Sequence, residues 1–225
     1  IAVATMELIR DSSPSADVMI RDQLAAAITS RLDTDFINPA KAAVAGVSPA
    51  SILNGVTAIP STGTDAEAVR NDIRLLFNSF IAANNAPTSG VFIMAATSAL
   101  ALSLMQNPLG QSEFPGLNMN GGNFMGLPAI VSQYVPAGVV ALVNANDIYL
   151  ADEGGIELAM STEASLQMDN APDNPTTATT VLVSLWQRNL IGFRCERTIN
   201  WARRRPSAVA YLSGVAWGVP AEAGG

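Results

Sequence analysis

The chain of 225 residues contains no histidine and only one cysteine. Without histidine, a histidine-based catalytic triad, a histidine metal site and a histidine pH switch are all excluded. Cys195 cannot form an intramolecular disulfide, which fits a reducing cytoplasm. It lies on the apolar side of an alternating run, so we interpret it as a core thiol and not as a nucleophile. A histidine-independent hydrolase remains an alternative, although no paired-acid motif supports it.

Charge is scarce as well. Charged residues make up 14% of the chain, against about 25% in an average soluble protein, and apolar residues make up 49%. So little charge suggests a surface that largely meets other protein. The apolar run at 91–105, VFIMAATSALALSLM, is shorter than the roughly 20 residues that a membrane-spanning helix needs. We therefore predict a buried strand at 90–94 followed by a helix at 95–106.

The few charges are unevenly distributed. Residues 1–185 carry a net charge of −11 and residues 186–225 a net charge of +4; eight acids and no base lie between Arg74 and Arg188. An acidic middle section repels polyanions, although it is also what an ordinary solvated surface looks like. We expect no binding to duplex DNA at physiological salt. The basic run at 203–205 is the exception, and we interpret it as a strand end that pairs with acids of a neighbouring copy.

Two amphipathic helices are predicted in the first 85 residues. Ser13 and Pro14 are typical of a helix start, and Asn38-Pro39 of a stop, so we expect a helix over 14–36 of about 33 Å. Its apolar residues are Val18, Ile20, Leu24, Ala27, Ile28, Leu32 and Phe36. A connector rich in Pro and Gly follows at 41–61. A second helix is then capped by Thr64-Asp65, with Glu67 as the capping-box partner of Thr64, and ends near residue 84.

The glycine-rich stretch at 108–126 is interpreted as a structural loop. A phosphate-binding loop needs Lys and then Ser or Thr after its last glycine, whereas Leu127-Pro128 stand here. Residues 146–160 are predicted to form a hairpin with its turn at Asp-Glu-Gly-Gly. Four acids lie in that hairpin, and calcium binding is the alternative to ordinary turn carboxylates: Asp147, Asp152, Glu153 and Glu157. The polar stretch at 168–180 is predicted to be a surface loop.

The stretch at 178–217 shows the strongest pattern in the chain. Residues 191–201 alternate between apolar and polar, with Arg197 as the one interruption, which predicts a long half-buried strand over 189–203. Pro206 ends it, and the apolar run 209–217 is predicted to return antiparallel to it. We expect Trp201 and Phe193 of this strand to pack against the Leu24, Ile28 and Leu32 side of the first helix, because both faces are apolar.

Four motifs occur in the order of one known family: TMELIRDSSPSADVMIRDQLAAAITSRLDTDFINP, GVSPASILNGVTAI, GNFMGLPAIVSQYVP, and NLIGFRCERTINW followed by RRRP and AVAYLSGVAW. Together they resemble the major capsid proteins of tailed phages with the HK97-like fold. The resemblance implies an α+β protein with a peripheral domain at 1–55 and 179–225, containing the spine helix 14–36 and long antiparallel strands. An axial domain is inserted at 56–178.

The resemblance also implies a function. Copies of a phage or prophage major capsid protein self-assemble as pentamers and hexamers into an icosahedral shell around the DNA genome. Scaffold, protease and portal proteins are the expected partners, with no membrane, cofactor, metal or catalytic residue. The expected location is the virion, after assembly in the host cytoplasm. A shell protein of an encapsulin-type nanocompartment is the alternative.

Two departures from the family bear on assembly. The N-terminal arm and extended loop that precede the opening segment in the family have no counterpart here, so we expect a fragment or processed chain that forms rings of five or six copies more readily than closed shells. Lys41 is the sole lysine, and the loop that usually supplies the crosslinking lysine has no counterpart, so the sequence gives no basis for claiming a covalent crosslink.

Overall fold

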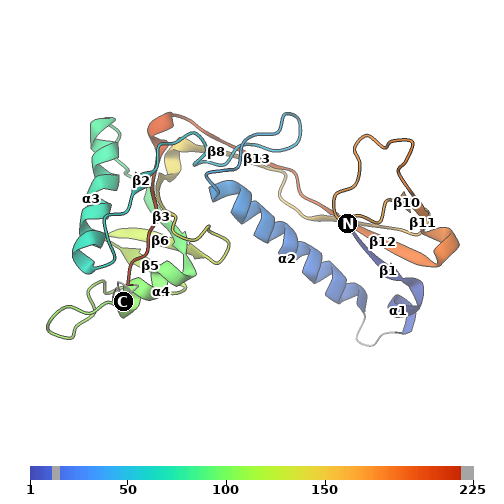
Figure 1. Cartoon of the computed structure of the whole chain (residues 1–225), viewed down its shortest axis with the longest axis horizontal. Coiled ribbons are helices and arrows are strands. Elements are labelled where there is room, and N and C mark those ends of the chain that lie inside the picture. Colours follow the sequence, from blue (N-terminus) through green and yellow to red (C-terminus); the bar gives the residue numbers. More distant parts are fainter. Residues whose placement is uncertain (12–15, 219–225) are drawn as a thin grey trace, which may run out of the picture. The chain divides into compact units, whose positions relative to one another are not determined.

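The computed structural model describes residues 1–11 and 16–218, and Figure 1 labels their helices and strands. The chain forms two compact units, each built from two separate segments: unit 1 is Ile1–Arg31 with Asp152–Thr198, and unit 2 is Leu32–Ala151 with Ile199–Gly225. These limits differ from the division at residues 55 and 178, which stays a prediction. No helix within the described ranges is long and apolar enough to cross a membrane.

Unit 1 is built around β12 (Leu190–Glu196), the central strand of a three-stranded antiparallel sheet. One neighbour is β1 (Ala2–Thr5) and the other is β9 (Glu157–Ser161). Phe193 of β12 is completely buried and stands opposite Ala2 and Met160. The remaining elements of the unit are α1 (Met6–Asp11), the paired strands β10 (Ser165–Leu166) and β11 (Val183–Ser184), and the 3-10 turn η2 (Trp186–Arg188).

The long helix α2 (Ala16–Ile37) begins in unit 1 and ends in unit 2. Its extent agrees with the prediction, while the predicted cap at Ser13 and Pro14 lies outside the described residues. In unit 1, Arg21 Nε donates to Asp17 at 2.8 Å and its Nη2 contacts Met160 Sδ at 3.4 Å. One expectation was wrong: Val18 is exposed instead of lying on an apolar stripe, because hydrophobicity alone does not select the face of a helix that a sheet covers.

Unit 2 contains a seven-stranded sheet in the order β2-β14-β7-β3-β6-β5-β4. The strands are β2 (Ile59–Pro60), β3 (Gly90–Ala95), β4 (Leu117–Asn118), β5 (Gly121–Phe124), β6 (Leu127–Ser132), β7 (Val140–Asn144) and β14 (Val209–Ser213). Its helices are α3 (Ala66–Ala82) and α4 (Ala96–Leu104). The unit also contains β13 (Ile199–Arg203), its partner β8 (Ile148–Asp152), whose last residue belongs to unit 1, and the 3-10 turns η1 (Ala145–Asp147) and η3 (Pro206–Ala208).

The strands of this sheet divide their side chains between two cores, as the two-residue period of a strand requires. On one face Phe92, Leu142 and Leu212 pack with the apolar stripes of α3 and α4. On the other face Ile93, Val143 and Tyr211 pack with the last turn of α2 and with Trp201 of β13. The sheet is therefore covered on both sides, which is why its central strands read as continuous apolar runs.

Trp201 is the residue that joins β13 to α2 within unit 2. Its ring meets Phe36 edge-on, with centroids 5.3 Å apart and an interplanar angle of 77°, and its Nε1 donates to the carbonyl of Ala50 at 2.8 Å. The predicted packing of the 189–203 stretch against the first helix is confirmed for Trp201, which meets Phe36 and shares a core with Leu32. Its predicted packing against Leu24 and Ile28 stays a prediction. The part of that prediction that concerns Phe193 stays a prediction.

Three predicted strand arrangements were wrong. The 189–203 stretch is two strands, β12 and β13, separated by Arg197 and Thr198. The run after Pro206 does not return along it, because β14 pairs with β7 and β2 inside the larger sheet. Residues 146–160 do not form a hairpin, since β8 pairs with β13 and β9 with β12. Alternation identifies a strand, but it does not identify the partner.

The predictions for the second helix and for the glycine-rich loop were nearly right. Of the predicted Thr64-Asp65 pair, Asp65 is the cap of α3, because its Oδ1 accepts from the backbone N–H of Ala68 at 2.8 Å; the capping box of Thr64 with Glu67 was wrong. The glycine-rich stretch contains the hairpin of β4 and β5. A Cβ at Gly122, where φ is 139°, would lie 2.1 Å from the carbonyl oxygen of Gly116, so only glycine fits there.

Candidate functional site

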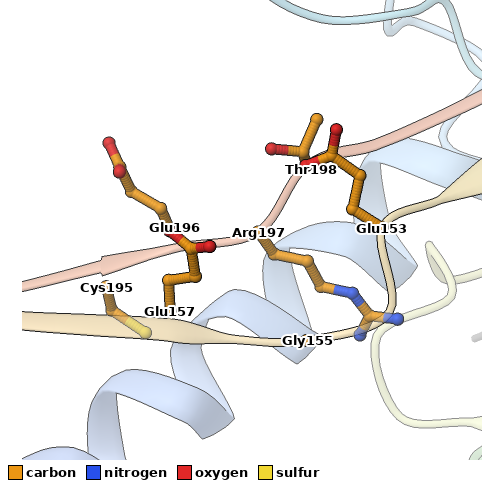
Figure 2. Close-up of a pocket in the computed structure, with 7 residues that line it drawn as sticks. All are labelled: Glu153, Gly155, Glu157, Cys195, Glu196, Arg197 and Thr198. Atoms are coloured by element: carbon orange, nitrogen blue, oxygen red, sulfur yellow. The ribbon is translucent and has the colours of Figure 1, made fainter.

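A bulge beside the pairing of β9 with β12 in unit 1 brings together several residues that the sequence analysis considered as candidates. Glu157 stands opposite Glu196, and the next backbone hydrogen bond joins the N–H of Glu153 to the carbonyl of Thr198. Residues 154–156 therefore face the single residue Arg197, and the positive φ of Gly154 allows the bulge to form. The result is an open pocket of about 530 Å³, drawn in Figure 2.

Arg197 compensates part of the negative charge at this bulge. Its Nη2 donates to Asp152 Oδ2 at 2.5 Å, and Figure 2 shows the guanidinium reaching toward the segment that carries Glu153 and Gly155. The hydrogen bond from Arg197, together with that from the Gly154 N–H, lowers the pKa of Asp152. The same pairing raises the pKa of Arg197. The interruption of the alternating pattern at Arg197 is thus explained by its ion pair.

The remaining side chains of the pocket offer polar contacts, but none of them is a nucleophile hydrogen-bonded to a general base. Glu157 and Glu196 are like charges placed directly across the ribbon, an arrangement that costs stability, and Arg194 relieves it through a 2.5 Å contact to Glu196 Oε2. Cys195 is half-buried here, so its assignment to the core was wrong; Figure 2 shows its sulfur and the Glu196 carboxylate on opposite sides of the strand.

The four acids proposed as an alternative calcium site do not form one cluster. Asp147 is buried in unit 2 and bound to Arg205, Asp152 is bound to Arg197, and Glu153 and Glu157 flank the bulge. Over residues 1–11 and 16–218, no group of three or more His, Cys, Asp or Glu side chains could hold a metal ion. The structure thus gives no support to the calcium alternative.

Two of the three consecutive arginines at 203–205 are used inside unit 2. Arg205 pairs with Asp147 at 3.0 Å, and Arg203 donates to the carbonyl of Asn54 at 2.8 Å. Burial would raise the pKa of Asp147, but hydrogen bonds from Asn85 and Asn144 and the charge of Arg205 outweigh burial and lower it. Arg204 is exposed, so it is the arginine of this run available to another molecule.

Lys41 and the glycine-rich loop have local structural roles. Lys41 Nζ donates to Ser48 Oγ at 2.7 Å and to the Ala42 carbonyl at 3.3 Å, which closes the turn around the Val44 to Ser48 bridge. In the glycine-rich loop, Asn107 Oδ1 accepts from the backbone N–H groups of Leu109 and Gln111. These contacts account for both features without a bound phosphate.

Unit 1 also presents an exposed apolar feature that the sequence analysis did not identify. Val181 and Trp186 are each 74% exposed and Leu182 is 52% exposed, and Arg188 follows them at the end of η2. We call these four residues the Trp186 protrusion. The same unit has an open recess of about 740 Å³, lined by the apolar residues Ile1, Val3, Leu166, Met168 and Pro172 and by the polar residues Gln167, Asp169 and Asn170. We call it the Met168 recess.

Comparison with known proteins places the chain in a family. The model of the phage capsid family matches residues 1–214. The chain belongs to the phage capsid family. A curated relative, the capsid polyprotein of Pseudomonas phage PAJU2, is 78% identical over 222 residues, which are 97% of this chain. The chain spans 33% of the length of that relative.

Solved structures agree on the fold of this phage capsid family member. A structure from Mycobacterium phage Adephagia matches with a TM-score of 0.67 at 14% identity, covering 98% of this chain and 71% of the other. The capsid of an empty GTA particle matches with a TM-score of 0.59 at 15% identity, covering 96% and 71%. The chain therefore has the α+β, HK97-like capsid fold, as its sequence motifs indicated.

Proposed function

We propose that this chain is the shell-forming part of a phage major capsid protein. Many identical copies would tile an icosahedral shell, as pentamers and hexamers, around the DNA genome. The observation that carries the proposal is the family match over residues 1–214, together with the 78% identical relative that is named a capsid polyprotein. The protein would then reside in the virion after assembly in the host cytoplasm.

Features of the described residues support a structural role. Exposed apolar side chains occur on both units, including Trp186 on unit 1 and Leu104 and Leu109 on unit 2. Such surfaces are typical of proteins that meet other copies. The pocket at the bulge contains no nucleophile paired with a base. We also propose that residues 1–55 and 179–225 act as the peripheral domain of the subunit and residues 56–178 as its axial domain.

Scaffold, protease and portal proteins are proposed partners during assembly, and DNA is proposed as enclosed cargo without sequence-specific binding. The nanocompartment alternative differs in what the shell encloses, and the phage origin of the 78% identical relative favours DNA. No cofactor is required for a function that depends on shape and burial. Covalent crosslinking through Lys41 is not part of the proposal.

Electron microscopy of the expressed protein tests this proposal. Negatively stained images of the chain, with the PAJU2 capsid polyprotein as a positive control, are expected to show rings of five or six copies or closed shells. Copurification of an enzyme cargo in place of nucleic acid would favour the nanocompartment alternative. Dispersed single subunits from this chain, beside well-formed shells from the control, would contradict the proposed role of residues 1–225.

A further inference from the structure

We propose that the Trp186 protrusion of one copy inserts into the Met168 recess of the next copy, with Arg188 facing Asp169. This contact rests on the proposed shell function, and it names residues that would select the neighbour. Both surfaces belong to unit 1, and each is formed by side chains of the described part of the chain.

The protrusion has the properties of an anchor. A tryptophan that is 74% exposed leaves a large apolar ring in water, and aromatic side chains bury about 150–250 Å² each when they are covered. Tryptophan and arginine are enriched among the residues that carry most of the binding energy of interfaces. Val181 and Leu182, a few residues earlier in the chain, are exposed apolar side chains as well.

The backbone that carries Trp186 is held firmly before any partner arrives. The preceding residue, Leu185, is completely buried, and its N–H donates to the Ala164 carbonyl at 3.0 Å. The carbonyl of Leu185 accepts from the N–H of Leu190 at 2.9 Å, which closes the turn. β11, just before it, is paired with β10 (the strands so labelled in Figure 1). A backbone that is already held loses little further conformational freedom on binding.

The Met168 recess has matching chemistry. Ile1, Val3, Leu166 and Pro172 provide apolar walls, and Met168 is 47% exposed beside them. Methionine is a flexible side chain that adapts well to an aromatic ring. The 167–173 loop that forms one wall is held by a hydrogen bond of its own, in which the N–H of Asp173 donates to Gln167 Oε1 at 2.8 Å. The recess is therefore a formed feature of unit 1.

Charge complementarity points to a second copy as the occupant. Asp169 lines the recess and accepts a 3.0 Å hydrogen bond from the Ala171 N–H, while the 167–180 loop contains no lysine or arginine. The protrusion carries the exposed cation Arg188. An acidic recess disfavours the phosphates of DNA. In the proposed contact each copy inserts its protrusion into the next copy and receives the protrusion of another, and such a heterologous arrangement builds rings or larger closed assemblies.

Sedimentation of single variants tests the anchor. Trp186→Ala is expected to weaken self-association of the chain by at least about tenfold, as removal of an interface anchor does. The matched control is Tyr149→Ala, which removes an aromatic ring that is 59% exposed and lies outside both surfaces. It should change association by less than about threefold. Thermal unfolding midpoints equal to that of the parent show that both variants are folded.

A charge exchange tests whether Arg188 of one copy pairs with Asp169 of the next. Arg188→Asp and Asp169→Arg should each weaken association, and the double variant should recover it, because the exchanged pair restores opposite charges. Recovery in the double variant excludes loss of folding as the cause. If both single variants associate weakly and the double variant associates no better, the pairing of Arg188 with Asp169 is contradicted.

Disulfide trapping between different copies is the most specific measurement. In a Cys195→Ser background, Trp186→Cys chains are mixed with Met168→Cys chains under mild oxidation, with Tyr149→Cys as the control partner. Efficient bridging requires Cα atoms within about 7 Å. Mixed dimers of Trp186→Cys with Met168→Cys support the contact, whereas dimers of Trp186→Cys with itself would mean a symmetric contact and overturn it.

The outcomes separate this contact from the proposed function. If the parent chain assembles, Trp186→Ala assembles equally well and no mixed disulfides form, the proposed contact is overturned while the shell function stands. A parent chain that remains monomeric and forms no mixed disulfide counts against the contact and the shell function together. If the parent chain copurifies with nucleic acid and Trp186→Ala does not, the protrusion binds DNA and the inference is overturned.

Discussion

The indole Nε1 of Trp217 donates a 2.9 Å hydrogen bond to Oδ2 of Asp72, a completely buried carboxylate 145 residues earlier in the chain. Asp72 also accepts from Ser61 Oγ at 2.6 Å and from the N–H and Oγ1 of Thr62, both at 2.8 Å. Four neutral donors thus satisfy one buried charge. The network fastens the end of the described chain to α3 within unit 2.

Replacement of Trp217 by Phe tests this fastening. The ring still fills the core beside Phe124, while Asp72 loses one donor. Hydrogen bonds to charged groups are worth about 1.5–3 kcal/mol, so the free energy of unfolding should fall by about that amount. Urea denaturation measures it. Trp186→Phe, at an exposed position, is the control and should change the free energy by less than about 0.5 kcal/mol; equal losses for both variants would contradict the assignment.

The cap of α3 is a second test within unit 2. Asp65→Ala removes the side-chain oxygen that accepts from the Ala68 N–H, and loss of such a cap costs about 0.5–2 kcal/mol. Thr64→Ala leaves this bond in place and is the matched control. Chemical denaturation of the two variants should show the larger loss for Asp65→Ala. The reverse order would assign the cap to Thr64 and contradict the role of Asp65.

The stability contributed by Asp147 should depend on pH. Its folded-state pKa lies below the ordinary value of 3.8, so the charged form stabilises the fold at neutral pH, and this contribution is lost as the pH falls below about 4. Asp147→Asn should lower the melting temperature at pH 7, and the difference from the parent should shrink as the pH is lowered toward about 3. A difference that stays constant across this range would show that the carboxylate charge has no such role.

Arg204 is the residue to change in a test of DNA binding, because Arg203 and Arg205 have contacts inside unit 2. We expect the parent chain not to retard duplex DNA at about 0.15 M salt, since exposed acids outnumber exposed bases among the described residues. Arg205→Ala should destabilise the fold more than Arg204→Ala, because it leaves Asp147 without its cation. A salt-dependent gel shift that Arg204→Ala abolishes would contradict the expectation.

The sequence predicted elements well and pairings poorly, for physical reasons. Helical periodicity located α2 and α3 to within a few residues, and the apolar run after residue 90 located β3 and α4. The partners of β14 and β9 were missed because strand pairing depends on contacts far apart in the chain, which alternation does not encode. Gly154 and Gly155 resembled a hairpin turn, yet they form a bulge in a longer ribbon.

Asp72 left a detectable signal in the sequence, whereas Trp186 did not. Asp72 falls on the same helical face as Val69 and Leu76, so an acid on an apolar stripe could have indicated a buried polar network. Trp186 gave no signal of its exposure, because a tryptophan beside Val and Leu is typical of a core. Only the folded turn around buried Leu185 places that ring in solvent.

The mass of the assembled protein in solution tests the central claim most directly. Mass photometry and sedimentation over a wide concentration range, at low and moderate salt, should show species of five or six times the 23.4 kDa chain, or larger closed particles. Screening at moderate salt should favour them, because like charges near a ring axis then repel over a shorter distance. A single 23.4 kDa species at every concentration and in both salts would contradict the account.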